Sequence, residues 1–324
     1  MQGGALSLNK LAFRVLEELL SEPERYGVEV LRAGGGSTIL DLGVRAPSGL
    51  EAGLKMVEIC LGGLGRAGLA WLELRGHLLP AVSVWTDRPA LATLGAQMAS
   101  WRLELAGEVV LGSGPARALA RKPKKVFRAL GHEEKADLAI LALEASRLPD
   151  EELLSRVADA CGVKPDALYV LVAPLASPAG LVQVVGRAVE ACLLKLFSAG
   201  LDVLAVRTAV GTALLPPPHS DADICMGRAN DALLYGSVVH LWADWPDEVA
   251  REAAREAPSC TSPAYGKPFL AIYEEAGRDF YKIDPGVFAP ARVVITSTRS
   301  GRTYTAGRLE ERLLLSSFGL EAAS

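Results

Sequence analysis

The sequence predicts an α/β protein of two domains, and three observations lead to this fold class. The chain has 324 residues, more than a single domain usually holds. Half of its residues are hydrophobic and 22% are charged, which favours a well-packed globular protein over a disordered one. Segments with the alternation and β-branched residues of strands are interspersed with segments of helical spacing. We therefore expect a mixed α/β subunit of two domains with a cleft between them.

The two ends of the chain carry hairpin patterns. Residues 34–36, 76–77 and 300–301 each separate two short strand-like runs and contain the glycines that tight turns favour. In the N-terminal part, helices are expected over residues 6–20, 49–61 and 88–100, and a strand over 101–105. In the C-terminal part, the patterns predict strands over residues 203–208 and 238–242, helices over 223–234 and 247–257, and a last helix that ends at Phe318.

The middle of the chain has a different order of elements. Residues 136–143, 149–161 and 168–173 have the patterns of a strand, a helix and a strand, which predicts a βαβ unit with parallel pairing. A long apolar helix over residues 179–197 follows. We therefore expect a discontinuous first domain built from residues 1–110 and 200–324, and a second domain over residues 111–199.

Two charged residues interrupt the most apolar stretch of the chain. Between Asp166 and Lys195 only Arg187 and Glu190 are charged, and they stand three positions apart. On one helix such residues share a face, and the apolar surroundings imply that both are buried. A buried charge is costly unless it is paired. The pair is either a structural ion pair or a catalytic carboxylate beside an arginine that controls its protonation. The prolines, the glycines and the pair itself argue against a transmembrane helix.

Two glycine-rich segments resemble ligand-binding loops. Residues 63–68 match the dinucleotide fingerprint GxGxxG, but a helix precedes the motif and a strand follows it, the reverse of what dinucleotide binding needs. We expect a helix end and a turn there. At residues 111–119, Ser113 and Gly114 precede a helix start, where backbone N–H groups favour an anion. Ser113, Gly114 and Arg117 are therefore candidates to contact an anionic part of a ligand, although a plain loop-to-helix junction is equally compatible.

Composition and residue spacing exclude several classes of protein and site. A net charge of −4 without a dense basic stripe gives no footprint for nucleic acid. The five cysteines are far apart and form no CxxC pair, which indicates free thiols in a reducing compartment. The four histidines show no metal-ligand spacing, so no metal site is expected. Because the first helix is amphipathic and unlike a signal peptide, we expect a cytoplasmic protein without membrane association.

Several longer motifs together resemble one family. The segments LGSGPARALA, APLAS with VQVVGRAVE, MGRANDALLYG, YGKPF, and FYKIDP with FAPA occur in the order and at the spacing of methenyltetrahydromethanopterin cyclohydrolases. The likeness covers essentially the whole chain. Arg88 stands where members of that family often have histidine, and residues 211–218 are unusual for it.

The resemblance carries expectations about activity, assembly and site residues. It implies a cytoplasmic enzyme that interconverts the methenyl and 5-formyl forms of a pterin one-carbon carrier with water, without a metal or prosthetic group. It implies a two-domain α/β subunit that holds the pterin in the interdomain cleft and assembles as a homotrimer. It assigns catalysis to Arg187 and Glu190 of the GRxVE segment. The further cleft residues that it implies are Asn230, Asp231, Tyr265, Lys267, Tyr281 and Lys282.

The chemistry of the methenyl bridge is consistent with this assignment. A carbon between two nitrogens in a methenyl bridge is already cationic, so it needs a deprotonated water and no Lewis acid. Glu190 would act as the general base, and Arg187 would hold the carboxylate ionised in a buried site. Two competing hypotheses stay open: a non-catalytic protein that binds a pterin or phosphate ligand, and a phosphotransferase that uses residues 112–117.

Overall fold

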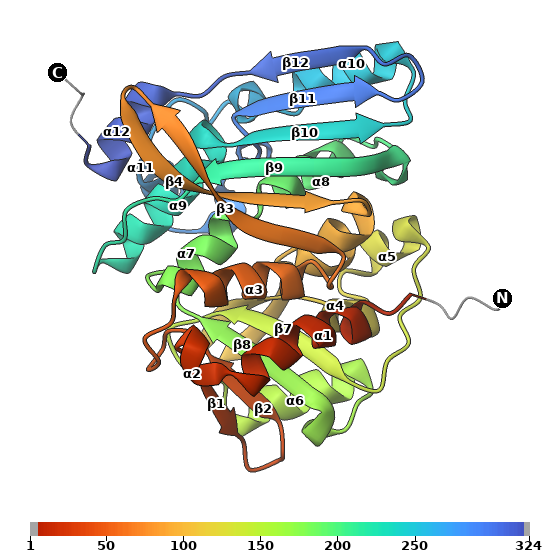
Figure 1. Cartoon of the computed structure of the whole chain (residues 1–324), viewed down its shortest axis with the longest axis vertical. Helices are drawn as coiled ribbons and strands as arrows, with labels where there is room; N and C mark the ends of the chain where they lie inside the picture. The colour runs from red at the N-terminus through yellow and green to blue at the C-terminus, as the bar shows by residue number, and fades with distance from the viewer. Residues whose placement is uncertain (1–5, 321–324) are drawn as a thin grey trace. The chain divides into compact units, whose positions relative to one another are not determined.

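The computed structural model describes residues 6–320, and the side chain of Tyr281 lies outside the description. Within these residues the chain forms two compact units (Figure 1). Unit 1 contains the residues up to Arg66 together with Ala90–Gln183, and unit 2 contains Ala67–Pro89 and the residues from Val184 onward. Each unit holds one six-stranded sheet with helices, so the predicted mixed α/β fold is confirmed.

The sheet of unit 1 has a parallel centre and antiparallel edges. Its strand order is β1-β2-β8-β7-β6-β5, and β8 pairs in parallel with both β2 and β7. The other neighbours pair antiparallel. The bounds are β1 (Glu29–Arg32), β2 (Thr38–Asp41), β5 (Trp101–Leu105), β6 (Glu108–Ser113), β7 (Ala139–Glu144) and β8 (Leu168–Ala173). The structure confirms the βαβ unit and the hairpin around residues 34–36 that the sequence predicts.

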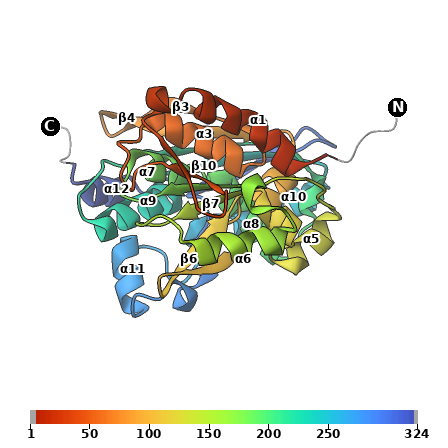
Figure 2. The same ribbon diagram turned by 90° about the horizontal axis from the view of Figure 1, so that it is seen from below.

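Helices cover both faces of this sheet. Figure 2 shows α1 (Leu8–Ser21) and α3 (Leu50–Cys60) on one face and α6 (Glu151–Cys161) on the other. Alternate residues of β7 point to opposite faces. Ile140 therefore packs in one core with α1 and α3, and Leu141 packs in a second core with α6. The remaining helices of this part are α2 (Pro23–Tyr26), the π-helix η1 (Leu91–Gln97), α4 (Ala116–Ala120), α5 (Lys124–Leu130) and η2 (Pro165–Ala167).

The sheet of unit 2 has the strand order β12-β11-β10-β9-β4-β3. Strands β10 and β11 are parallel, whereas β9 pairs antiparallel with β10 and β4, and β12 pairs antiparallel with β11. The bounds are β3 (Gly65–Leu74), β4 (His77–Thr86), β9 (Val206–Leu214), β10 (Val238–Ala243), β11 (Arg292–Ser297) and β12 (Thr303–Gly307). The hairpin at residues 300–301 is therefore confirmed.

Helices α8 (Ala188–Ser198) and α9 (Ala222–Gly236) contact β9, and α10 (Asp247–Glu256) contacts β11 and β12. The other helices of this part are η3 (Val203–Ala205), η4 (Ser259–Thr261), α11 (Phe269–Glu275), η5 (Phe280–Lys282), η6 (Pro285–Val287) and α12 (Glu311–Phe318), and α7 (Pro178–Val185) begins in unit 1 and ends in unit 2. Among residues 6–320 there is no helix with the length and apolarity needed to cross a membrane.

Some predicted elements differ from the observed ones. The single helix expected over residues 179–197 is two helices, α7 and α8, because Arg187 leaves helical geometry with φ −96° and ψ 7°. The helix expected over residues 88–100 is shorter and is the π-helix η1. Strand β6 was not predicted: no element was expected over residues 108–110, and residues 111–113 were expected to lie in a loop before a helix.

The predicted domain division is corrected by the sheet topology. Residues 1–66 and 90–110 were assigned to the same domain as the C-terminal part, but β1, β2, β5 and β6 join the sheet of β7 and β8 in unit 1. Residues 184–199 belong to unit 2. These pairings join segments that are far apart in the sequence, and the pattern within a segment does not specify its partner strand.

Candidate active site

Arg187 and Glu190 lie at the N-terminal end of α8. Arg187 occupies the N-cap position and Glu190 the first turn. The two residues are 9% and 7% exposed, and Arg187 Nη1 lies 3.7 Å from Glu190 Oε2. Both residues have further interaction partners. The two charged groups are therefore adjacent and buried, as the apolar stretch around them predicts, although the helix is interrupted just before them.

The end of the helix that carries Glu190 suits an anionic side chain. The first turn of a helix has backbone N–H groups without intrahelical acceptors, and the helix dipole is positive at this end. A guanidinium at 3.7 Å adds a second favourable interaction with a carboxylate. A buried carboxylate in such surroundings has the properties of a general base that accepts a proton from water.

A glycine in β9 sets the distance between α8 and the sheet. A Cβ atom at Gly211 would lie 2.7 Å from Val189 Cγ2 and 3.3 Å from the Val189 backbone nitrogen. A side chain at this position would therefore push the first turn of α8 away from the strand. Glycine inside a strand often marks such a close approach. The sequence offered this signal, since residues 211–218 stood out as unusual, but the role of Gly211 is visible only in the structure.

The predicted anion loop is a packed junction in unit 1. Ser113 is 3% exposed, and its hydroxyl lies 3.6 Å from Cys60 Sγ. The Gly114 N–H donates to the Ala96 carbonyl, and the glycine has φ +91°, a value that disfavours other residues. The helix that follows, α4, has only five residues. The structure therefore gives no support to an anion cradle at this helix start.

Arg117 is held by contacts within unit 1, and its predicted contact with a ligand stays a prediction. Its side chain is completely buried. The guanidinium donates to the Leu94 and Ala96 carbonyls at 2.9–3.3 Å, and its central carbon lies 5.9 Å from the centre of the Phe127 ring. Arg117 therefore joins α4 to the carbonyls of η1.

Asp231 and Asn230 lie on α9 in unit 2. The Asp231 carboxylate is 1% exposed and accepts hydrogen bonds from the Phe269 N–H and the Ser317 hydroxyl. Burial raises the pKa of Asp231 to about 6. The Asn230 side chain donates to the Met226 carbonyl one turn earlier in the same helix. These contacts join α9 to the start of α11 and to α12, and a contact of either residue with a pterin stays a prediction.

The remaining residues implied by the resemblance also have partners in unit 2. The Tyr265 hydroxyl donates to Glu310 Oε1 at 3.0 Å, and burial raises the pKa of Tyr265. The exposed Lys267 forms an ion pair with Glu275 at 2.7 Å, and Lys282 Nζ lies 4.0 Å from Asp279 Oδ2. The side chain of Tyr281 lies outside the described residues. Substrate contacts of Tyr265, Lys267, Tyr281 and Lys282 therefore stay predictions.

Comparison with known proteins decides the family. A family model described as Cyclohydrolase (MCH) matches residues 7–318. The chain belongs to this cyclohydrolase family. The resemblance seen in the sequence motifs is therefore confirmed, and every predicted site residue falls within the matched range.

Relatives of this cyclohydrolase-family chain match it along nearly their full length, and each of the following is named methenyltetrahydromethanopterin cyclohydrolase. The protein of Methanocella arvoryzae is 41% identical over 317 residues, which cover 98% of this chain and 99% of the relative. The protein of Methanocaldococcus jannaschii is 42% identical over 319 residues, or 97% and 98% of the two chains. The protein of Methanothermobacter marburgensis is 39% identical over 322 residues, or 97% and 100%.

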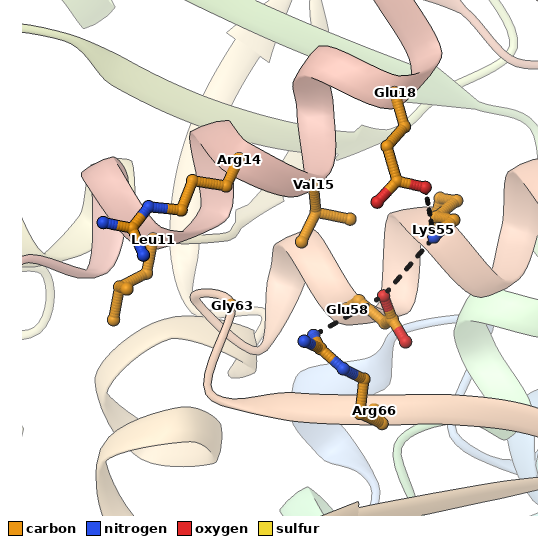
Figure 3. A pocket seen from close by; sticks show the side chains of 8 residues that line it. All are labelled: Leu11, Arg14, Val15, Glu18, Lys55, Glu58, Gly63 and Arg66. Atoms are coloured by element: carbon orange, nitrogen blue, oxygen red, sulfur yellow. Dashed lines mark ion pairs between the residues drawn. The ribbon is translucent and has the colours of Figure 1, made fainter.

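Sequence reasoning missed a charged pocket in unit 1 of this cyclohydrolase-family chain. The pocket holds about 330 Å³ and lies between α1, α3 and the start of β3 (Figure 3). Lys55 Nζ is 2.6 Å from Glu18 Oε2 and 3.9 Å from Glu58 Oε2, and the latter oxygen is 3.8 Å from Arg66 Nη1. Charged residues at such spacing are common on solvated helix faces, so no sequence pattern indicates this pocket. Its lining contains none of the predicted site residues.

A second pocket, of about 360 Å³, lies beside the C-terminal half of α8. Lys195 lines it and donates from Nζ to the carbonyls of Pro258 and Gly286 and to the Thr261 hydroxyl, at 2.7–2.9 Å. Burial lowers the pKa of Lys195. This lysine anchors the helix that also carries Glu190, which lies near the opposite end of α8.

Among residues 6–320 there is no group of three or more histidine, cysteine or acidic side chains with a metal-binding arrangement.

Proposed function

We propose that this chain is a cyclohydrolase that adds water to the methenyl bridge of a methenyl-tetrahydropterin of the tetrahydromethanopterin type and forms the 5-formyl derivative. The observation that carries the proposal is the family match over residues 7–318, together with relatives of that name at 39–42% identity over nearly the full length of both chains. The buried pair of Arg187 and Glu190 supplies residues suited to this reaction.

In the proposed mechanism Glu190 is the general base. It accepts a proton from a water molecule while the water oxygen forms a bond to the cationic methenyl carbon, which gives a neutral hydroxylated bridge. The hydroxyl proton then leaves, the carbonyl of the formyl group forms, and the bond from this carbon to the second bridge nitrogen breaks. That nitrogen takes up a proton, so one proton is released overall. General acid–base catalysis of this kind typically contributes about 10²–10⁴-fold to the rate.

Arg187 has two roles in this proposal. Its guanidinium favours the ionised carboxylate at a buried position where burial alone would favour the protonated acid. It also holds the Glu190 side chain in one orientation, and orientation of reacting groups is itself a large part of enzymatic rate enhancement. In the reverse direction the protonated Glu190 assists the loss of water, so we propose a reversible reaction. Because the methenyl carbon is already electrophilic, the proposed reaction uses no prosthetic group, and the tetrahydromethanopterin-type carrier is the substrate.

Substitution of the proposed base tests the function. We expect Glu190→Gln to lower kcat by about 10²–10⁴-fold, because glutamine has the size of glutamate but accepts no proton at neutral pH. The hydrolysis of methenyl-tetrahydromethanopterin is followed by its near-ultraviolet absorbance, and binding is measured separately by calorimetry. Glu252→Gln is the control, since this carboxylate lies exposed on α10 in unit 2. Turnover by Glu190→Gln within threefold of the wild-type rate would refute the catalytic role, and a wild-type chain that binds the pterin without turnover would indicate a binding protein instead.

A further inference from the structure

The charged pocket of unit 1 has no role in the proposed reaction, and its lining carries an excess of positive charge. Three cations line it, Arg14, Lys55 and Arg66, against two carboxylates, those of Glu18 and Glu58 (Figure 3). Three positive and two negative charges leave a formal net charge of +1. The pocket volume of about 330 Å³ lies within the range of pockets that hold small organic ligands. Charge and volume together favour a small anion.

Lys55 holds the two carboxylates of the pocket. Its Nζ lies 2.6 Å from Glu18 Oε2 and 3.9 Å from Glu58 Oε2. Burial acts to lower the pKa of Lys55, but the hydrogen bond with Glu18 and the nearby Glu58 carboxylate raise it, so the lysine stays charged. The two carboxylates therefore share a cation inside the pocket, which reduces their repulsion of an incoming anion.

The two arginines have hydrogen-bond donors to spare. Arg66 Nη1 lies 3.8 Å from Glu58 Oε2, which is too far for a hydrogen bond. The one described hydrogen bond of its side chain is 3.4 Å long and goes to the carbonyl of the neighbouring Gly65. Within residues 6–320, Arg14 has no hydrogen-bond or ion-pair partner. Because each guanidinium presents five N–H donors in a planar fork, both arginines can still bind a carboxylate.

The two guanidinium groups lie in different parts of the pocket. Figure 3 shows the Arg66 guanidinium beside Glu58 and the Arg14 side chain on the other side of Val15, near Leu11. Val15 and Leu11 supply apolar surface to the same pocket. A single compact anion such as phosphate therefore meets one guanidinium only. A ligand that uses both arginines needs two acidic groups joined by a short carbon chain.

Gly63 fixes the walls of the pocket relative to each other. It follows α3 with φ +69°, and a Cβ atom there would lie 2.6 Å from the Leu11 carbonyl carbon and 2.7 Å from the Leu11 carbonyl oxygen. Both are backbone atoms of α1, so no side-chain rotation could make room. The turn that leads to Arg66 thus lies directly against the helix that carries Arg14. A site held in place in this way needs little reordering when it binds a ligand.

We propose that this pocket binds a short-chain dicarboxylate, with one carboxylate held by Arg14, the other by Arg66, and the carbon chain against Leu11 and Val15. Arginine and carboxylate form two parallel N–H···O bonds, which makes each end of the ligand a specific contact. The lining contains neither Arg187 nor Glu190. The site is therefore additional to the proposed reaction and does not depend on it.

Binding of succinate to the full-length chain tests the proposal. In calorimetric titrations at low salt, we expect succinate to bind the wild-type chain at least about 10-fold more tightly than propionate, which lacks one of the two carboxylates. Inorganic phosphate should also bind at least about 10-fold more weakly than succinate. Arg14→Gln and Arg66→Gln should each lower the affinity for succinate by about 10-fold or more. Arg128→Gln is the matched control, because Arg128 lies exposed on α5 of unit 1, and this variant should bind succinate like the wild type.

Circular dichroism of each variant separates loss of binding from loss of folding. Arg14 is exposed and has no described partner, so Arg14→Gln keeps the test informative if Arg66→Gln fails to fold. Succinate binding that either folded arginine variant weakens while Arg128→Gln does not supports the proposal. A wild-type chain that binds no succinate, equal affinity for succinate and propionate, tighter binding of phosphate, or equal weakening by Arg128→Gln would each overturn it. Titrations without the methenyl substrate keep this outcome separate from that of the Glu190→Gln experiment.

Discussion

Replacement of Gly211 by alanine tests whether the position of α8 governs the reaction. The new Cβ would lie 2.7 Å from Val189 Cγ2 and 3.3 Å from the Val189 backbone nitrogen. Carbon atoms in contact are normally separated by about 3.5 Å or more, so helix and strand must separate by roughly 0.8 Å. Because the backbone nitrogen belongs to the helix itself, a side-chain rotation at Val189 does not relieve the whole conflict. The first turn of α8, which carries Glu190, therefore has to move.

The shift predicts both a kinetic and a thermodynamic effect. Overpacking in a well-packed region costs about 1–3 kcal/mol of unfolding free energy. A displacement of about 1 Å in a reacting group can cost about 100-fold in rate, so we expect kcat to fall by about 10–100-fold. KM should change less, because the substitution adds no group that contacts substrate. The rate is measured from the absorbance of the methenyl substrate and the stability from urea denaturation.

Two further variants make the test specific. Gly68→Ala is the control in the same sheet, because its Cβ would meet only the Trp85 ring at an ordinary 3.8 Å. Val189→Ala in the Gly211→Ala background removes the closest conflict and should restore part of both kcat and stability, which a double-mutant cycle quantifies. If Gly211→Ala keeps kcat within twofold of the wild type while Glu190→Gln is inactive, the argument that close packing of α8 on β9 positions the catalytic group is refuted.

Three further predictions concern charged groups. Arg187→Ala should lower kcat and move the acidic limb of the pH–rate profile to higher pH, because the carboxylate loses the cation that favours its ionised form; an unchanged profile would mean that Arg187 is only structural. Burial acts to raise the pKa of Glu134, but hydrogen bonds from His132 and from residues at the N-terminus of α1 lower it from 4.5 to about 2. This carboxylate therefore stabilises the fold above about pH 4.5 by up to about 3 kcal/mol, and the contribution disappears as the pH falls towards 2. Urea denaturation should show Glu134→Gln less stable than the wild type at pH 7 and nearly equal at pH 2.5, and equal stability at pH 7 would contradict this. Burial raises the pKa of Asp231 from 3.8 to about 6, so the wild type should lose up to about 3 kcal/mol of stability as the pH rises from about 4 to 6. Asp231→Asn should remove this part of the pH dependence without lowering stability at pH 7, and a variant that keeps the wild-type dependence would exclude Asp231 as its source.

Local patterns in the sequence predicted local structure and the nature of the candidate site. Residues 168–173 form an apolar run that contains β-branched valines, and they form β8 at those bounds. A strand that is buried on both faces appears in the sequence as such a continuous apolar run, so it can be predicted without knowledge of its partner strands. The two charges at Arg187 and Glu190 predicted a buried pair, because no other charged residue occurs in that apolar stretch. Motifs spread over the whole chain predicted the family, which the comparisons confirm.

The structural features that the sequence did not predict depend on contacts between distant segments. Arg117 was predicted to contact an anionic part of a ligand from a helix start, but it is buried and the Leu94 and Ala96 carbonyls, about twenty residues earlier, accept its hydrogen bonds. Strand β6 was not predicted because its edge position beside β5 and β7 depends on which strands pair. The same pairings fix the division into units, which no single segment specifies.

The strand order of unit 2 has a consequence for synthesis of the protein. Strand β4 pairs with β9, and about 120 residues separate Thr86 from Val206 in the sequence. At a translation rate of about 5–20 residues per second, the hairpin of β3 and β4 waits roughly 6–24 seconds for its neighbouring strand to leave the ribosome. During that time the inner edge of β4 has no partner, and Trp71 and Leu78, which are 65% and 66% exposed even in the folded chain, add apolar surface. A nascent chain stalled in this interval is therefore the form in which we expect chaperone binding or aggregation.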